Sequence, residues 1–313
     1  MRLRRLIIVG GLVVLLAGLA VAFVFVFGQP AAQGPAQGRA LLVVGAENEY
    51  ANVLAQIGGP YVQAVGIMVN PNTDPHTFEA STVDAEEVAK AALIVQNGLG
   101  YDSFMQSLEA ASPSPGRIVL TAAQIVRTPQ GTPNPHLWYR PGTMQAVAGR
   151  IAQALAKLEP SHKDYFRQRV AAFDRSLAPW RQAVARLRAT AAGAWVAPME
   201  PVADYLLKAG DLHIATPWTF ELAVMNGEDP SPQDVTHVES LIIHRQVSAL
   251  VYNFQAVEPT TASMLKLARQ HGVPVVGVYE TMPRGYDYQR WMLAETTALD
   301  AAITKHKSEV LAP

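Results

Sequence analysis

A heptad repeat of apolar residues near the centre of the chain most constrains its fold. Between Ser161 and Ala191, apolar residues recur at alternating intervals of four and three positions. This period of about 3.5 residues indicates one long helix with a narrow apolar stripe, and Pro179 is expected to kink it by removing an intrahelical hydrogen bond. Such a helix can join a coiled coil or lie across two lobes. The stripe consists of Phe166, Val170, Phe173, Leu177, Trp180, Val184 and Leu187.

Short apolar runs alternate with amphipathic helices on both sides of this segment. Strands are predicted at 41–44, 61–69, 93–95 and 118–120, and again at 195–197, 213–215, 249–252 and 275–278. Helices are predicted at 50–57, 83–90, 103–110 and 141–158, and again at 202–209, 233–245, 259–271 and 288–305.

This alternation predicts an α/β fold of two lobes, because strands that alternate with helices form parallel sheets covered by helices. Each lobe is expected to hold a small parallel sheet with flanking helices, and one long rigid helix should join the lobes. The predicted boundaries are 40–158 for the N-terminal lobe, 159–191 for the linking helix and 192–313 for the C-terminal lobe. Open α/β sheets bind ligands at the carboxyl ends of their strands.

Residues 1–39 are predicted to be a signal or anchor segment followed by a tether. Three arginines, at positions 2, 4 and 5, precede an uncharged apolar run from Leu6 to Gly28. That run is longer than the apolar core of a cleaved signal and long enough to span a bilayer. A small-residue cleavage site at Ala20-Val21-Ala22 keeps the cleaved signal open as the alternative. Either pattern predicts that the rest of the chain lies outside the cytoplasm, in the periplasm or on the outer face of the membrane.

Composition excludes several classes of protein. Half of the residues are hydrophobic, which excludes a disordered chain and suffices for two cores. Lys and Arg number 25 against 26 Asp and Glu, so the basic excess of a nucleic-acid binder is missing. The sequence contains no cysteine, which excludes disulfides, thiolate metal sites and a lipid-modified N-terminal cysteine.

Two loops of the first lobe each place a histidine directly after a proline. His76 lies in Asn70-Pro-Asn-Thr-Asp-Pro-His-Thr-Phe-Glu79, after the second predicted strand, and His136 lies in Asn134-Pro-His-Leu-Trp-Tyr139. Proline holds each backbone extended ahead of the imidazole. These histidines are either metal ligands or hydrogen-bonded surface residues.

Two acids of the second lobe follow predicted strands in the same way. Glu200 follows the strand at 195–197 and precedes Pro201, where an acid is also favourable simply as the start of a helix. Glu280 follows the strand at 275–278 and is alternatively an exposed loop acid. Two neutral imidazoles and two carboxylates carry a charge of −2, which neutralises one divalent cation, and nitrogen and oxygen donors suit Zn²⁺, Mn²⁺ or Fe²⁺.

The motifs resemble those of the extracytoplasmic solute-binding proteins of ABC importers for zinc and manganese. The similarity covers most of residues 40–305 and is most specific at 74–79, 97–102 and 134–139, with weaker support at 199–200 and 275–283. It implies metal held between two lobes by His76 and His136 of the first lobe and Glu200 and Glu280 of the second. It also implies delivery of that metal to an ABC-type permease in the cytoplasmic membrane by a protein expected to be monomeric.

The resemblance also bears on the choice of metal. Zinc-specific members carry a histidine-rich loop, whereas the stretch Gln124–Pro133 contains no histidine. Those members also tend to use a third histidine where this chain has Glu200, so the ligand set looks more like that of manganese-type members. Zn²⁺ nevertheless binds a given site more tightly than Mn²⁺, so affinity alone does not identify the physiological metal.

Two other function classes remain as alternatives. A metal-dependent hydrolase would use Glu79 or Glu200 as a base, but it needs an open coordination position, whereas four candidate ligands close a four-coordinate site. A surface adhesion protein could use the same fold. We therefore expect a transport protein and no catalysis. Because imidazole binds metal only when neutral, affinity is expected to fall below about pH 6.5. Because the long helix is anchored on both lobes, only small lobe movements are expected on metal release.

Overall fold

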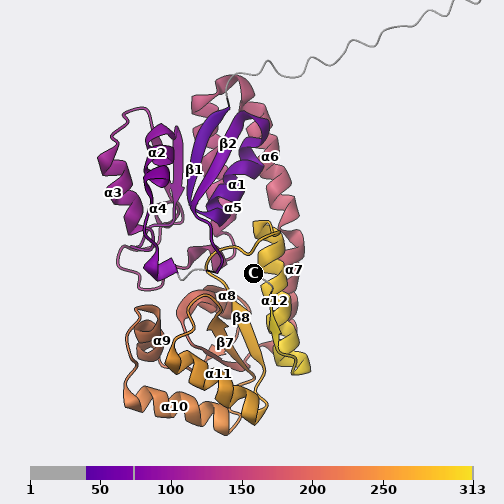
Figure 1. The fold of residues 1–313 in the computed structure, drawn as a ribbon. Helices are drawn as coiled ribbons and strands as arrows, with labels where there is room; N and C mark the ends of the chain where they lie inside the picture. Colours follow the sequence, from indigo (N-terminus) through magenta and orange to yellow (C-terminus); the bar gives the residue numbers. More distant parts are fainter. Residues whose placement is uncertain (1–39, 73–74, 312–313) are drawn as a thin grey trace, which may run out of the picture. The chain divides into compact units, whose positions relative to one another are not determined.

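The computed structural model describes residues 40–72 and 75–311, and Figure 1 shows their arrangement. The predicted signal or anchor segment with its tether, residues 1–39, therefore lies outside the described residues. Within the described part of the chain, no helix is both long enough and apolar enough to cross a membrane.

The first lobe is built on a parallel sheet in the order β2-β1-β3-β4. The central strand β1 pairs with both neighbours, so that Val43 lies opposite Ala64 on one side and Leu93 on the other. Its alternate residues face opposite sides of the sheet, and Val43 and Val44 belong to different apolar clusters. The strands are β1 (Leu41–Glu47), β2 (Val62–Met68), β3 (Leu93–Gln96) and β4 (Ile118–Thr121).

Helices cover both faces of this sheet, as the alternating pattern predicts. One face packs against α1 and α5, and the other packs against α2 and α3 (Figure 1). A capping box begins α2, because Ser81 and Asp84 bond to each other's backbone N–H groups. The helices are α1 (Asn48–Gly58), α2 (Thr82–Lys90), α3 (Ser103–Ala111), α4 (Ala122–Ile125) and α5 (Thr143–Leu158).

The second lobe repeats the plan with a parallel sheet in the order β6-β5-β7-β8-β9. Alternate residues of β7 again divide between two apolar clusters, Val251 with α8 and α12 and Leu250 with α10 and α11. The strands are β5 (Trp195–Pro198), β6 (His213–Ile214), β7 (Ala249–Asn253), β8 (Val275–Val278) and β9 (Glu309–Val310). The helices are α8 (Asp204–Ala209), α9 (Trp218–Met225), α10 (Pro232–Ile243), α11 (Pro259–His271) and α12 (Tyr288–Lys305).

The central segment corrects one expectation: it forms two helices, α6 (Lys163–Ser176) and α7 (Ala178–Ala191), that meet at Leu177. Pro179 explains the break, because it has no N–H to donate and its ring excludes the carbonyl four residues earlier. The heptad stripe is nevertheless used as predicted. Its aromatic members Phe166, Phe173 and Trp180 are buried, with α6 packed against α1 and α5 and α7 packed against α8 and α12.

Candidate metal centre

The four predicted ligands lie beyond the carboxyl ends of strands in both lobes. His76 lies in a short 3₁₀ helix, η2 (Pro75–Thr77), on the loop after β2, and His136 caps the 3₁₀ helix η3 (Leu137–Tyr139). Glu200 lies two residues after β5, at the N-terminus of the 3₁₀ helix η5 (Pro201–Ala203), and Glu280 lies two residues after β8. Parallel strands bring these ends to one edge of each sheet, which explains why residues so distant in sequence can meet.

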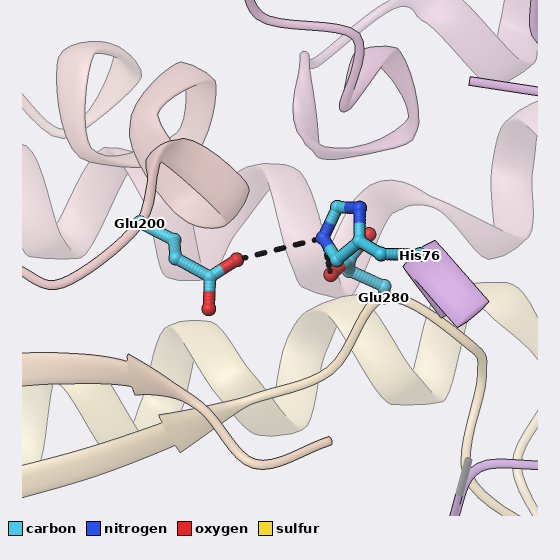
Figure 2. Close-up of side chains that lie close together, drawn as sticks. All are labelled: His76, Glu200 and Glu280. Atoms are coloured by element: carbon cyan, nitrogen blue, oxygen red, sulfur yellow. Dashed lines mark ion pairs between the residues drawn. The ribbon is translucent and has the colours of Figure 1, made fainter. Parts of the chain in front are cut away.

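The structure brings all four side chains into one cluster. Figure 2 shows His76 facing Glu200 and Glu280. His76 Nε2 lies 3.4 Å from Glu280 Oε1 and 3.8 Å from Glu200 Oε2. His136 Nε2 lies 3.2 Å from Glu280 Oε2. Ligand atoms at about 2.1 Å around a tetrahedral ion are separated by about 3.4 Å. One ligand atom from each of His76, Glu200 and Glu280 lies within 4.8 Å of the other two, which is close to that spacing, whereas His136 faces the second carboxylate oxygen of Glu280.

Burial differs among the four side chains. Those of His136, Glu200 and Glu280 are fully buried, whereas the side chain of His76 is 29% exposed. A cavity of about 450 Å³ borders His76, lined by Tyr101 and Phe104 of the first lobe and Leu222 and Met225 of α9. His76 therefore faces the solvent side of the cluster, where an ion would enter.

Asn134 holds His136 in the tautomer that a metal ligand needs. Its Oδ1 accepts a hydrogen bond from the His136 backbone N–H at 3.0 Å and contacts ring Nδ1 at 2.9 Å. Because an amide oxygen only accepts, Nδ1 carries a proton, and Nε2, which lies 3.2 Å from Glu280 Oε2, is the nitrogen that would bind a metal. The Asn134 amide also donates to the carbonyl of Pro201 at 2.7 Å, which ties the His136 loop to the segment that follows Glu200.

Sequence reasoning missed two polar residues: Asn253, which contacts both carboxylates, and Gln255, which holds the backbone at Glu280. The Asn253 amide donates to Glu280 Oε1 at 2.5 Å and lies 3.5 Å from Glu200 Oε2. Gln255 Oε1 accepts from the backbone N–H groups of Glu280 and Thr281 at 2.7 and 2.8 Å. Asn253 ends β7, between the strands that carry the two acids, so the strand-end rule applied to that strand would have found it.

Two further buried acids were also missed. Glu47 ends β1 and Glu49 lies in the first turn of α1, and both are fully buried. Among the described residues, none of their four carboxyl oxygens has a hydrogen-bond partner. Burial raises the pKa of both carboxyls well above the ordinary value for Glu. Burial therefore favours the neutral form of both acids, in contrast to the charged form expected of metal ligands.

His76 and Glu280 are each held in the charged form by the groups that face them. Burial alone would lower the pKa of the His76 imidazole, but the facing Glu200 and Glu280 carboxylates outweigh burial and raise that pKa to about 11. Burial alone would raise the pKa of Glu280, but His136 and His76 outweigh it and hold that pKa well below its usual range. For Glu200 burial prevails over His76, and its pKa is raised. As long as no metal is bound, the carboxylates therefore hold a proton on His76.

The chain has two α/β lobes, and histidine and carboxylate side chains meet between them. This arrangement defines a class of metal-binding proteins. Comparison with known proteins identifies the family. Residues 43–302 match the model of the ZnuA family, described as zinc-uptake complex component A, periplasmic. The chain belongs to this family.

Individual relatives are distant and partial. The chain is 25% identical over 141 residues to the manganese-binding lipoprotein MntA of Bacillus subtilis (strain 168), covering 43% of this chain and 46% of that protein. It is 29% identical over 171 residues to the zinc-binding protein TroA of Treponema pallidum (strain Nichols), covering 52% and 54% respectively. The chain thus spans about half the length of the curated relatives it matches.

Solved structures share the fold. The SBP FpvC from Pseudomonas aeruginosa in complex with Ni²⁺ superposes with a TM-score of 0.69 at 22% identity, covering 87% of this chain and 100% of that chain. The Mn-bound periplasmic metal binding protein from Candidatus Liberibacter asiaticus superposes with a TM-score of 0.70 at 15% identity, covering 84% and 99%. The expectation of two small parallel sheets flanked by helices is confirmed by these comparisons.

Proposed function

We propose that this protein captures a divalent transition metal outside the cytoplasm and delivers it to an ABC-type permease for import. The observation that carries the proposal is the convergence of His76, Glu200 and Glu280, whose ligand atoms lie within 4.8 Å of one another, with His136 Nε2 3.2 Å from Glu280. Membership of a metal-uptake family supports it. The metal is the cargo, and the four side chains are its ligands.

Transport fits the site better than hydrolysis does. A catalytic metal keeps one coordination position open for water, whereas four protein ligands close a four-coordinate site. The only partly exposed ligand is His76, which faces the cavity beside α9. This arrangement favours enclosing an ion and later releasing it over activating a water molecule on it.

The donor set accommodates Mn²⁺, Zn²⁺ or Fe²⁺, with Zn²⁺ expected to bind more tightly than Mn²⁺. The relatives include proteins named for both metals, since MntA is named manganese-binding and TroA is named zinc-binding. We propose Mn²⁺ or Zn²⁺ as cargo, and the decisive measurement is the metal content of protein isolated from its native compartment. Protein that carries neither metal there, and that binds neither when purified, would overturn the proposed function.

Titration with Mn²⁺ and Zn²⁺ tests the ligand set. Glu280→Gln removes one negative charge but keeps the shape of the side chain, so affinity should fall by at least about a hundredfold. Glu228→Gln is the matched control, because Glu228 is an exposed acid of the same lobe and should leave affinity unchanged. Equal affinities of the two variants would show that Glu280 is not a ligand.

A further inference from the structure

The loop that carries Glu280 belongs to the second lobe by sequence, but side chains of the first lobe hold it. Asn48, the first residue of α1, donates from Nδ2 to the carbonyl of Met282 at 2.8 Å. The backbone N–H of Met282 returns a bond to Asn48 Oδ1 at 2.9 Å. One amide side chain thus satisfies both backbone groups of a residue two positions after Glu280.

A second side chain of the first lobe holds the other end of this loop. Tyr139, three residues after His136, donates from its hydroxyl to the carbonyl of Tyr279 at 2.7 Å. The same hydroxyl contacts Glu295 of α12, whose Oε1 accepts from the backbone N–H of Tyr279 at 3.1 Å and from Trp291 Nε1 at 2.7 Å. The side chains of Tyr139 and Glu295 are buried, so these bonds are shielded from competing water.

Glu200 is held much less firmly than Glu280. Its Oε1 is buried and has no hydrogen-bond partner among the described residues, and its Oε2 reaches Asn253 only at 3.5 Å. Glu280 Oε1 lies 2.5 Å from the same Asn253 amide, and its backbone N–H is bonded to Gln255. The backbone after Glu200 is tied to Asn134 through the carbonyl of Pro201, but its carboxylate has no comparable support.

We propose that Asn48, Tyr139 and Glu295 are positioning residues that hold the Glu280 loop against the first lobe, so that Glu280 is in place beside His76 and His136 before a metal binds and Glu200 supplies the last bond. The inference rests on the proposed function, because it concerns the same metal site. On this proposal, the Glu200 carboxylate moves when metal is captured and released, whereas the loop that carries Glu280 stays in place.

Cobalt provides the test, because the visible absorption of Co²⁺ reports its coordination geometry. Asn48→Ala should free the loop, allow water to replace Glu280, weaken the four-coordinate absorption, and raise the Co²⁺ dissociation rate by about tenfold to a hundredfold. Tyr139→Phe should act in the same direction through an independent contact. Thermal unfolding of each variant shows that it is folded.

Matched controls separate positioning from general cohesion of the lobes. Gln56 is another half-buried residue of α1, and its side-chain amide bonds to Gln289 of α12 without touching the Glu280 loop. Tyr288 is another buried tyrosine, and its hydroxyl donates to the carbonyl of Trp138 at 2.6 Å. Gln56→Ala and Tyr288→Phe should leave the Co²⁺ spectrum and its dissociation rate unchanged. If they act as strongly as Asn48→Ala and Tyr139→Phe, the proposed positioning role is wrong.

A double-mutant cycle identifies the ligand through which Asn48 acts. In the Glu280→Gln background, Asn48→Ala should have no further effect on Co²⁺ dissociation, because the ligand it positions is already removed. In the Glu200→Gln background it should keep its full effect. Additive effects with Glu280→Gln would overturn the proposal, whereas failure of the wild-type protein to bind Co²⁺, Mn²⁺ or Zn²⁺ would overturn the proposed function itself.

Discussion

Metal affinity should rise steeply with pH above neutrality, because binding must displace a proton from His76. With its pKa raised to about 11 by Glu200 and Glu280, His76 is protonated throughout pH 7 to 8.5 while no metal is bound. Each bound ion then releases one proton, so affinity rises about tenfold per pH unit and about 30-fold across this range. A histidine with an ordinary pKa near 6.5 would leave affinity almost flat above pH 7.5.

The folding stability of the metal-free protein changes with pH in the opposite direction to metal affinity. A histidine whose pKa is raised in the folded state stabilises the metal-free protein fully below about pH 6.5. That contribution is lost as pH rises toward the folded-state pKa of about 11. The same carboxylates therefore stabilise the protonated, metal-free protein and compete with metal binding at low pH.

Calorimetry in two buffers of different ionisation enthalpy measures the number of protons released, and competition with a chelator measures affinity at each pH. His76→Gln should bind more weakly and lose the slope between pH 7 and 8.5, because glutamine has no proton to displace. His213→Gln is the control, since His213 is exposed on β6 and outside the site. No proton release at pH 7.5, together with flat affinity, would refute the reasoning.

Four further outcomes are expected. His136→Ala should lower Mn²⁺ and Zn²⁺ affinity by at least about a hundredfold while far-ultraviolet circular dichroism stays unchanged, because it removes one of four metal bonds and no backbone contact; unaltered affinity would remove His136 from the site. Trp180→Ala should lower the free energy of unfolding in urea by about 3–5 kcal/mol. The Trp180 indole is only 3% exposed, so its removal leaves a cavity against α12. As the control for Trp180→Ala, Trp195→Ala should lower the free energy of unfolding only slightly, because that side chain is 51% exposed. Since burial raises the pKa of Glu47, wild-type stability should fall as pH rises above about 4.5, and unfolding of Glu47→Gln should show a weaker pH dependence between pH 5 and 8; parallel curves would contradict this. X-ray scattering should give the same radius of gyration with and without metal, because α6 and α7 are packed on both lobes; a clear decrease on binding would show that the lobes close.

Local patterns in the sequence were sufficient to predict most elements of the fold. The spacing of apolar residues predicted α11, α12 and β8 with the bounds they have, because a helix or strand buried on a regular face repeats its apolar residues with a fixed period. It did not predict α9, which has no such single stripe, or β9, which is only two residues long. It predicted one helix with a kink at Pro179, whereas the structure has two helices, α6 and α7, that meet at Leu177. The heptad continues unbroken through the proline, although the proline interrupts the backbone hydrogen bonds.

The sequence also limited which residues could form the site. The Pro-His loops and the acids after two strands indicated His76, His136, Glu200 and Glu280, because strand ends and proline-restrained loops are local features. Their roles as metal ligands, the boundaries of the lobes and the anchoring by residues 6–28 stay predictions.

Only the tertiary structure decided how these side chains meet and what supports them. The spacing in sequence between Asn48 and Met282, or between Tyr139 and Glu295, carries no signal of their hydrogen bonds, because such contacts depend on how one lobe packs on the other. The pKa of His76 likewise depends on two carboxylates that follow it by more than a hundred residues. The sequence by itself determined the local elements and the chemical types of the ligands. The packing of the lobes determined the distances between the four side chains of the site, the charges of those side chains and how firmly each side chain is held.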